Sequence, residues 1–234
     1  MKAIRSFRFT VLALVLTSAA LASVHAAELT LAQRIVKLKN SLDASQIKLR
    51  HYEWIQTTVV TVNGNEKSRV QERCYYGADG GLQKVTVGVP TSAPRKGGIS
   101  GKIQAKKAKS ANDYMKRAID LVGSYVPPIP VKLQASKDAG NASIHLLDPG
   151  KRARLVFGNY WLSGDNLGAD ISLVDNHLLG LTVNSYLDDP EDVVTLTVKM
   201  GRLNDGSSYP ATSTLFAKRK SIQVVVTNGG YKKV

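Results

Sequence analysis

The chain of 234 residues contains one cysteine, Cys74, so it cannot form an internal disulfide bond. It also lacks a long apolar run after its first 26 residues, because no later stretch approaches the roughly 18 apolar residues of a membrane-spanning helix. A domain without disulfides must be held together by its hydrophobic core, which a chain of this length can build. We therefore expect a soluble domain in which Cys74 is a small buried apolar residue rather than a reactive thiol.

No residue pattern in the sequence identifies a reaction. It has no Gly-x-Ser-x-Gly turn of a serine hydrolase and no glycine-rich phosphate loop followed by Lys and Ser or Thr. His51, His145 and His177 lie on separate predicted elements, without metal-ligand spacing to one another or to a cysteine. The acidic segment 188–192 could attract Ca²⁺, but a hairpin turn explains it more simply. We therefore predict no enzyme, no metal and no cofactor, with a hydrolase as the least favoured alternative.

The N-terminus has the pattern of a secretory signal peptide. Residues 1–8 hold three Lys or Arg and no acid, residues 11–21 are mostly apolar, and Val24 and Ala26 supply small residues before a cut. No cysteine follows this position to carry a lipid. The sequence therefore predicts a signal over 1–26 and a periplasmic or secreted protein.

Positive charge is the second prominent feature. The chain carries a formal net charge of +14, and the three basic residues of the predicted signal leave +11 on residues 27–234. Residues 88–109 are rich in Gly and Pro and contain no acid, which predicts a mobile basic loop. This loop is either a solvated insertion or a contact for an anionic membrane surface or an acidic protein. The export signal argues against nucleic acid. The candidate contact residues are Lys102, Lys106, Lys107 and Lys109.

The hydrophobic pattern alternates between helical spacing and a period of two. Helical spacing predicts an amphipathic helix over 30–50, a helix from Ser110 that ends before Pro127-Pro128, and a short helix from Pro130 to Gly140. Asn63-Gly64 is a strong hairpin signal between two strands. Period-two segments separated by short turns predict ten antiparallel strands: 52–62, 67–76, 82–87, 142–147, 152–157, 167–174, 178–187, 193–200, 209–217 and 221–227.

One face of the last strands is apolar and the other is polar, as in an antiparallel sheet with one buried face. About ten strands on one sheet should twist and curl, and three helices are available to cover the concave face. We predict an α+β fold, a strongly curved half-barrel covered by an N-terminal helix and a two-helix insertion. Residues 27–234 would then form a single domain. Its concave face would be either filled or an apolar cavity, with these candidate lining residues: Leu179, Leu181, Val183, Val194, Leu196, Val198, Ile222 and Val224.

The order of these elements resembles that of the LolA/LolB-type lipoprotein carriers. The segments Tyr125-Val126-Pro127-Pro128, 185–192, 204–206 and Tyr209-Pro210 also resemble uncharacterised exported bacterial proteins of this kind. The resemblance implies a half-barrel with a helical lid over an apolar cavity that accepts acyl chains. The helical insertion after only three strands departs from the carriers' arrangement, and none of the carriers' functional residues matches a position here.

Two functional hypotheses follow. The first is an exported protein that binds a hydrophobic ligand, an acyl chain, a lipid or a lipoprotein, in the cell envelope. The second is a non-enzymatic envelope interaction module with a filled core and a basic docking loop. The sequence leaves both open, because residues that fill a core and residues that line an apolar cavity are of the same types.

Overall fold

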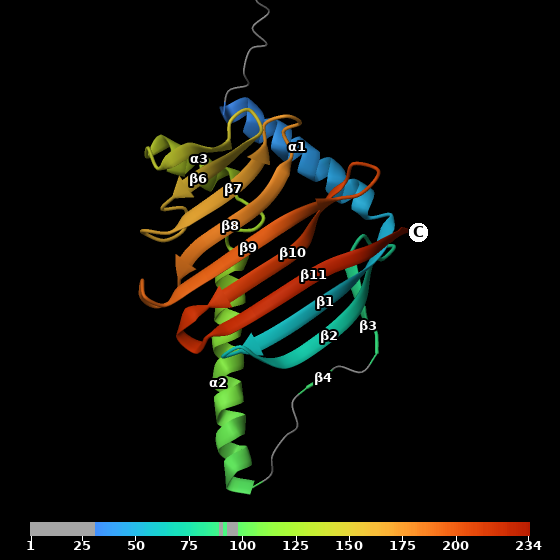
Figure 1. The fold of residues 1–234 in the computed structure, drawn as a ribbon, viewed down its shortest axis with the longest axis vertical. Coiled ribbons are helices and arrows are strands. Elements are labelled where there is room, and N and C mark those ends of the chain that lie inside the picture. The colour runs from blue at the N-terminus through green and yellow to red at the C-terminus, as the bar shows by residue number, and fades with distance from the viewer. Residues whose placement is uncertain (1–30, 89–90, 93–97) are drawn as a thin grey trace, which may run out of the picture.

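The computed structural model describes residues 31–88, 91–92 and 98–234 (Figure 1). The predicted signal over 1–26 lies outside these residues. The elements, in chain order, are α1 (Leu31–Leu49), β1 (Tyr52–Val62), β2 (Asn65–Tyr76), β3 (Leu82–Thr86), β4 (Thr91–Ser92), α2 (Gly98–Gly123), α3 (Pro130–Asp138), β5 (Ala142–Asp148), β6 (Arg152–Gly158), β7 (Asn166–Ser172), β8 (Leu178–Tyr186), β9 (Val193–Arg202), β10 (Ser208–Ala217), the 3₁₀ helix η1 (Lys218–Lys220) and β11 (Ile222–Lys233).

All strands belong to one antiparallel sheet in the order β3-β2-β1-β11-β10-β9-β8-β7-β6-β5, with β4 beside β2. The N-terminal meander and the C-terminal meander are joined by the pairing of β1 with β11, in which Val60 lies opposite Val224. The sheet is curved and stays open, because β3 and β5 each end it without a further partner along this path. The predicted α+β half-barrel is therefore confirmed.

Short turns connect neighbouring strands as the sequence predicts. At the β1–β2 turn, Asn63 and Gly64 both have positive φ angles, 51° and 74°, as a tight hairpin turn requires. Pro130 occupies the start of α3, where its missing N–H costs no hydrogen bond, and Gly140 follows the helix with a φ of 74°. These local signals set the places where the chain turns.

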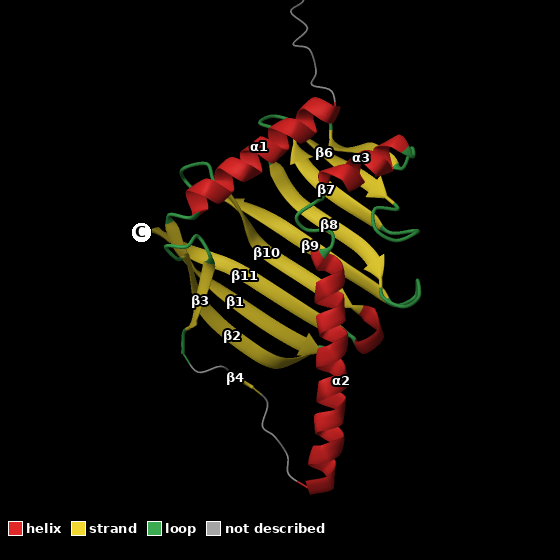
Figure 2. Ribbon diagram, turned by 180° about the vertical axis from the view of Figure 1, so that it is seen from behind, coloured by secondary structure: helices red, strands yellow, loops and turns green. Residues whose placement is uncertain are grey.

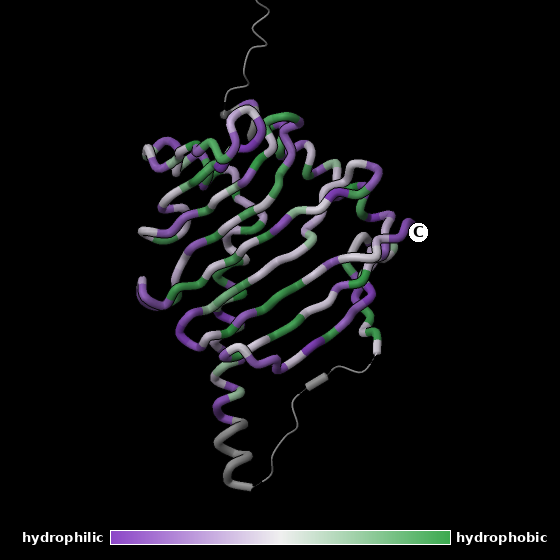
Figure 3. The backbone as a smooth tube through the Cα atoms, in the orientation of Figure 1, coloured by the Kyte–Doolittle hydropathy of each residue, from purple (hydrophilic) through white to green (hydrophobic). Residues whose placement is uncertain are grey.

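The three helices lie on one side of the sheet, called the inner face below (Figure 2). The closest helix–strand contacts are α1 with β10, α2 with β9 and β10, and α3 with β6. Hydropathy alternates along the strands (Figure 3), since successive side chains point to opposite faces. On β6, for example, Ala153, Leu155 and Phe157 are buried on the inner face. Within the described residues, no helix is long and apolar enough to cross a membrane.

The main correction to the sequence prediction concerns the segment 88–109. The prediction of a loop was wrong over 98–109, because α2 begins at Gly98 rather than at Ser110. Residues 104–109 are Gln, Ala and Lys only, all strong helix formers, and this propensity extends the helix without an apolar face. The N-terminal turns of α2 extend beyond the strands of the sheet (Figures 1 and 2).

Candidate ligand-binding surface

The inner face is fully covered over strands β6–β9. Leu155, Leu167 and Val183 are at most 2% exposed, and they belong to one hydrophobic cluster with Ala118 and Val122 of α2. Helices α2 and α3 cover this part of the sheet. This half of the molecule is therefore an ordinary packed core.

Apart from Ile222 and Val224, which are buried in the core, the inner face over β1, β2 and β11 is less deeply buried. Val60, Val62 and Val226 are partly buried and pack against the core cluster on one side. In the strand register, Val60 lies opposite Val224, and Thr58 lies opposite Val226 on one side and Val70 on the other. Residues directly opposite each other point to the same face of a sheet, so these side chains share the inner face with the buried core residue Val224. Most of them are only half-buried, and none of the closest helix contacts involves β1, β2 or β11. We call the half-buried set the open inner face; it consists of Thr58, Val60, Val62, Val70 and Val226.

The candidate cavity residues predicted from the sequence form one cluster with one exception. Seven of them are buried in the hydrophobic core: Leu181, Val183, Val194, Leu196, Val198, Ile222 and Val224. Leu179 is half-buried and is not among the residues of this cluster, in which Leu178 takes its place. The register between β7 and β8 shifts between Asp170 and Ile171, and such an irregularity exchanges the faces of the side chains beyond it.

The open inner face is bounded at one end by a row of polar side chains. The Gln56 amide donates to Glu72 Oε2 at 3.4 Å, and the Lys84 ammonium donates to Gln56 Oε1 at 3.3 Å. The Lys84 ammonium also lies 3.8 Å from the Glu72 carboxylate. These groups satisfy one another, so the sheet surface changes from apolar to polar at this row.

A cluster of aromatic rings lies beyond the polar row, where β1, β2, β10 and β11 meet. Trp54 stacks on Tyr231 with ring centroids 5.4 Å apart and an interplanar angle of 13°, and Tyr209 lies 4.3 Å from Tyr231. Burial, and secondarily Tyr209, raises the pKa of Tyr231, which keeps its hydroxyl neutral. Cys74 is fully buried, which confirms the prediction of a buried cysteine, and burial raises the pKa of its thiol.

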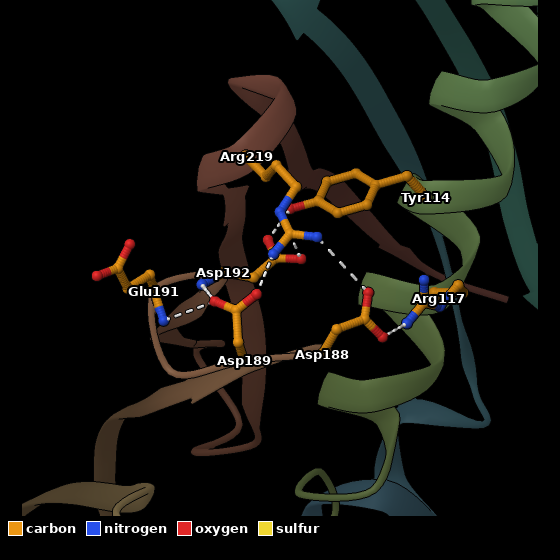
Figure 4. A network of polar contacts seen from close by, with 7 residues as sticks. All are labelled: Tyr114, Arg117, Asp188, Asp189, Glu191, Asp192 and Arg219. Atoms are coloured by element: carbon orange, nitrogen blue, oxygen red, sulfur yellow. Dashed lines mark hydrogen bonds and ion pairs between the residues drawn. The ribbon is translucent and has the colours of Figure 1, made fainter.

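A second polar network joins the β8–β9 turn to η1 and α2 (Figure 4). Arg219 forms ion pairs with Asp188 at 3.7 Å, with Asp192 at 3.3 Å, and with Asp189. The Asp192 side chain is fully buried, and the Tyr114 hydroxyl donates to its Oδ1 at 2.5 Å. Burial, followed by the hydrogen bond to Asp192, raises the pKa of Tyr114 to about 12. Tyr114 therefore remains a donor at every physiological pH.

The same network explains the acidic turn 188–192. Asp189 Oδ1 accepts from the backbone N–H groups of Glu191 and Asp192 at 3.0 Å, as in an Asx turn. Arg117 of α2 donates to Asp188, and this hydrogen bond lowers the pKa of that carboxyl. The turn is held by arginines. In the described part of the chain, no group of three or more His, Cys, Asp or Glu side chains is placed to hold a metal ion.

A third network fixes the loop between β6 and β7. The buried Asp165 carboxylate accepts from the backbone N–H groups of Tyr160 at 2.6 Å, Trp161 at 3.0 Å and Leu162 at 2.6 Å. It also accepts from the hydroxyl of Tyr125, a fully buried residue just after α2. Asp165 is thus a structural acceptor whose oxygens are taken up by the protein itself.

The predicted contact lysines all lie on α2. Lys106, Lys107 and Lys109 are exposed, whereas the side chain of Lys102 lies outside the described residues. Lys106 and Lys109 line a surface pocket of about 400 Å³ between α2 and η1, and Lys107 does not. The sequence pointed to these lysines through their charge. It had no signal for the arginine and lysine of η1 on the opposite wall.

No protein-family model matches the chain, and no curated protein matches it. Among solved structures, it is similar to a LolA superfamily protein from Nitrosomonas europaea, with 8% identity and a TM-score of 0.33 over 83% of this chain and 94% of that one. It is similar to a DUF1329 family protein from Desulfovibrio piger ATCC 29098, with 6% identity and a TM-score of 0.33 over 84% and 93% of the two chains. A third similar structure is the MucA/MucB complex of Pseudomonas aeruginosa, with 10% identity and a TM-score of 0.20 over 82% and 92%.

One of these structures is of a protein from the superfamily that the sequence resembles. At these identities and TM-scores, the likeness carries no conclusion about the fold, ligand or partner of this chain.

Proposed function

We propose that this protein is exported to the cell envelope and there binds an apolar ligand, the acyl chain of a lipid or lipoprotein, on the open inner face. The observation that carries the proposal is the contrast between the two halves of the inner face. Core side chains such as Val183 are fully buried, whereas Val60, Val70 and Val226 on the same face are only half-buried. The N-terminal pattern of residues 1–26 supports export.

The open inner face has dimensions that suit a chain-like ligand. From Thr58 to Val62 the strand rises about 13 Å at about 3.3 Å per residue, and three neighbouring strands extend the surface by about 10 Å across. Each methylene taken out of water contributes about 0.8 kcal/mol, so six buried methylenes supply about 5 kcal/mol before the cost of ordering the chain. The deeper core residues Leu181, Val183 and Leu196 could reach such a ligand only if α2 moved away from β9 and β10.

The positions of the reactive side chains support a binding role without catalysis. Cys74 is buried with a raised thiol pKa. His145 contacts Ser143 Oγ at 2.9 Å on the edge strand β5, and His177 contacts Asp175 at 2.5 Å near the β7–β8 turn. Neither histidine lies on the open inner face, so neither is placed to act on a ligand bound there.

The test compares two neighbouring valines of β1. Val60→Lys places a charge on the open inner face, and Val59→Lys places the same charge on the outer face of the same strand at a similarly half-buried position. We expect a fluorescent fatty acid to bind the wild-type protein and Val59→Lys with similar affinity. Val60→Lys should weaken binding at least tenfold, because the lysine must stay hydrated where the chain would lie. Thermal unfolding of both variants separates lost binding from lost folding.

Equal affinity of the two variants for the fatty acid would contradict this location. Native mass spectrometry of protein purified from a bacterial envelope provides a second test. A ligand-free mass, together with no uptake of the fluorescent fatty acid by the wild-type protein, would refute lipid binding. That outcome would favour the second candidate, an interaction module, which the exposed Lys106, Lys107 and Lys109 on α2 support.

A further inference from the structure

The pocket between α2 and η1 is lined almost entirely by polar and charged side chains. Its volume is about 400 Å³, and it lies on the side of α2 that faces η1. Its lining includes five cationic side chains and two acidic ones, together with a serine and a tyrosine: Lys106, Lys109, Arg117, Arg219, Lys220, Asp113, Asp188, Ser110 and Tyr114.

The arginines of this pocket are already engaged by the protein. Arg117 pairs with Asp188, and Arg219 pairs with Asp188, Asp189 and Asp192. These pairs neutralise the arginines and fix their positions. Three carboxylates thus face two guanidiniums, so this network carries one excess negative charge, and the unpaired positive charge of the pocket resides on its lysines.

The lysines leave donors available to a ligand. Lys220 donates to the Ser110 carbonyl at 2.9 Å and to Ser110 Oγ at 2.5 Å, and its ammonium lies 5.5 Å from the centre of the Tyr114 ring. These contacts hold the Lys220 charge in place at the pocket wall. Among the described residues, neither Lys106 nor Lys109 takes part in an ion pair. Three ammonium groups thus surround one depression with at most one unpaired carboxylate, that of Asp113, beside them.

The pocket lies next to the apolar end of the open inner face. Lys220 is the last residue of η1 and precedes Ile222, the first residue of β11. Ile222 pairs with Val62, at the end of β1, and Figure 2 shows α2 passing beside this end of the strand. A ligand whose chain lies on Val62 and Val60 would therefore have its end directed toward the lysines.

We infer that the pocket formed by Lys106, Lys109 and Lys220 binds a phosphate-type anion, the headgroup of an amphiphile whose chain occupies the open inner face; this assignment of the ligand class rests on the proposed function. Several ammonium donors arranged around a depression complement an anion with several oxygens, because each ammonium can meet a different oxygen. The same chemistry would accept free inorganic phosphate, so the test must separate the two sources.

The experiment measures the affinity of the purified protein for dodecyl phosphate, dodecanol and inorganic phosphate by calorimetry. Lys109→Gln and Lys220→Gln each remove one charge from the pocket. Lys107→Gln is the matched control, since Lys107 is exposed on the same helix but does not line the pocket. We expect dodecyl phosphate to bind more tightly than dodecanol. Each pocket variant should lose about fivefold in affinity for dodecyl phosphate and none for dodecanol, and the control should change neither.

The outcomes distinguish the headgroup assignment from the proposed function. If dodecanol binds but dodecyl phosphate binds no more tightly, or if Lys107→Gln loses as much affinity as the pocket variants, the headgroup assignment is overturned and lipid binding stands. If inorganic phosphate binds in a lysine-dependent way while neither dodecyl compound binds more tightly than phosphate, the pocket is a site for a free anion and lipid binding is refuted. If none of the three probes binds, both proposals fail.

Discussion

Replacing Arg219 by alanine tests how the inner-face helix α2 is held against the sheet. The Asp192 side chain is fully buried, whereas the side chain of Arg219 is 46% exposed. Besides Arg219 at 3.3 Å, the partner of the Asp192 carboxylate is the Tyr114 hydroxyl of α2. Without the guanidinium, a carboxylate remains in the interior without a compensating charge, which typically costs 3–5 kcal/mol. Because Arg219 is half-exposed, we expect the lower end of this range, about 3 kcal/mol.

The assay is reversible unfolding in urea, with thermal unfolding as a second measurement. A loss of about 3 kcal/mol should lower the melting temperature by about 6–12 °C in a domain of this size. Arg117→Ala is the control, because the Arg117–Asp188 pair is more than half exposed on both sides and should contribute at most about 1 kcal/mol. Adding Asp192→Asn to Arg219→Ala should restore part of the loss, since the buried charge is then removed. If Arg219→Ala costs no more than Arg117→Ala, the buried carboxylate does not depend on Arg219 and the reasoning is refuted.

Two further predictions concern the loops that hold the helices. Asp205 accepts a hydrogen bond from the Tyr52 hydroxyl at 2.9 Å, and its pKa is lowered from 3.8 to about 2, chiefly by the side chain and backbone of Ser207. The stabilising effect of the ionised Asp205 carboxylate is therefore present above pH 4 and is lost as the pH falls toward 2. Between these pH values, the urea midpoint should fall more steeply for the wild-type protein than for Asp205→Asn. Parallel plots of the urea midpoint against pH for the two proteins would contradict this. Asp165→Ala leaves the buried N–H groups of 160–162 without their acceptor and should cost about 3 kcal/mol, with faster amide exchange in this loop. A loss below about 0.5 kcal/mol would show that water replaces the carboxylate.

The sequence alone does not predict which part of the inner face stays uncovered, although it identifies the residues that lie on that face. The alternation of Thr58, Val60 and Val62 predicts that they share a face, but it does not tell whether a helix covers that face. The eight candidate lining residues all lie on the more strongly apolar C-terminal strands. Seven of them lie in the hydrophobic core, because strongly apolar strands are also the best packing partners for a helix.

The sequence alone determined four features: the N-terminal signal pattern, the hairpin at Asn63-Gly64, the antiparallel strands and the apolar face of those strands. Each depends on interactions between residues that are close in the chain, so local spacing is enough to specify them. The sequence pattern does not indicate the start of α2 at Gly98, although helix propensity is local, because residues 98–109 show no apolar periodicity.

Only the tertiary structure decided which parts of the sheet the helices cover and which charges meet. The pairing of β1 with β11 joins residues about 170 positions apart, and Tyr114 reaches Asp192 across 78 positions. No local pattern encodes such contacts, because they depend on how the sheet curves and where α2 crosses it. The open inner face and the lysine pocket beside it exist through these long-range contacts.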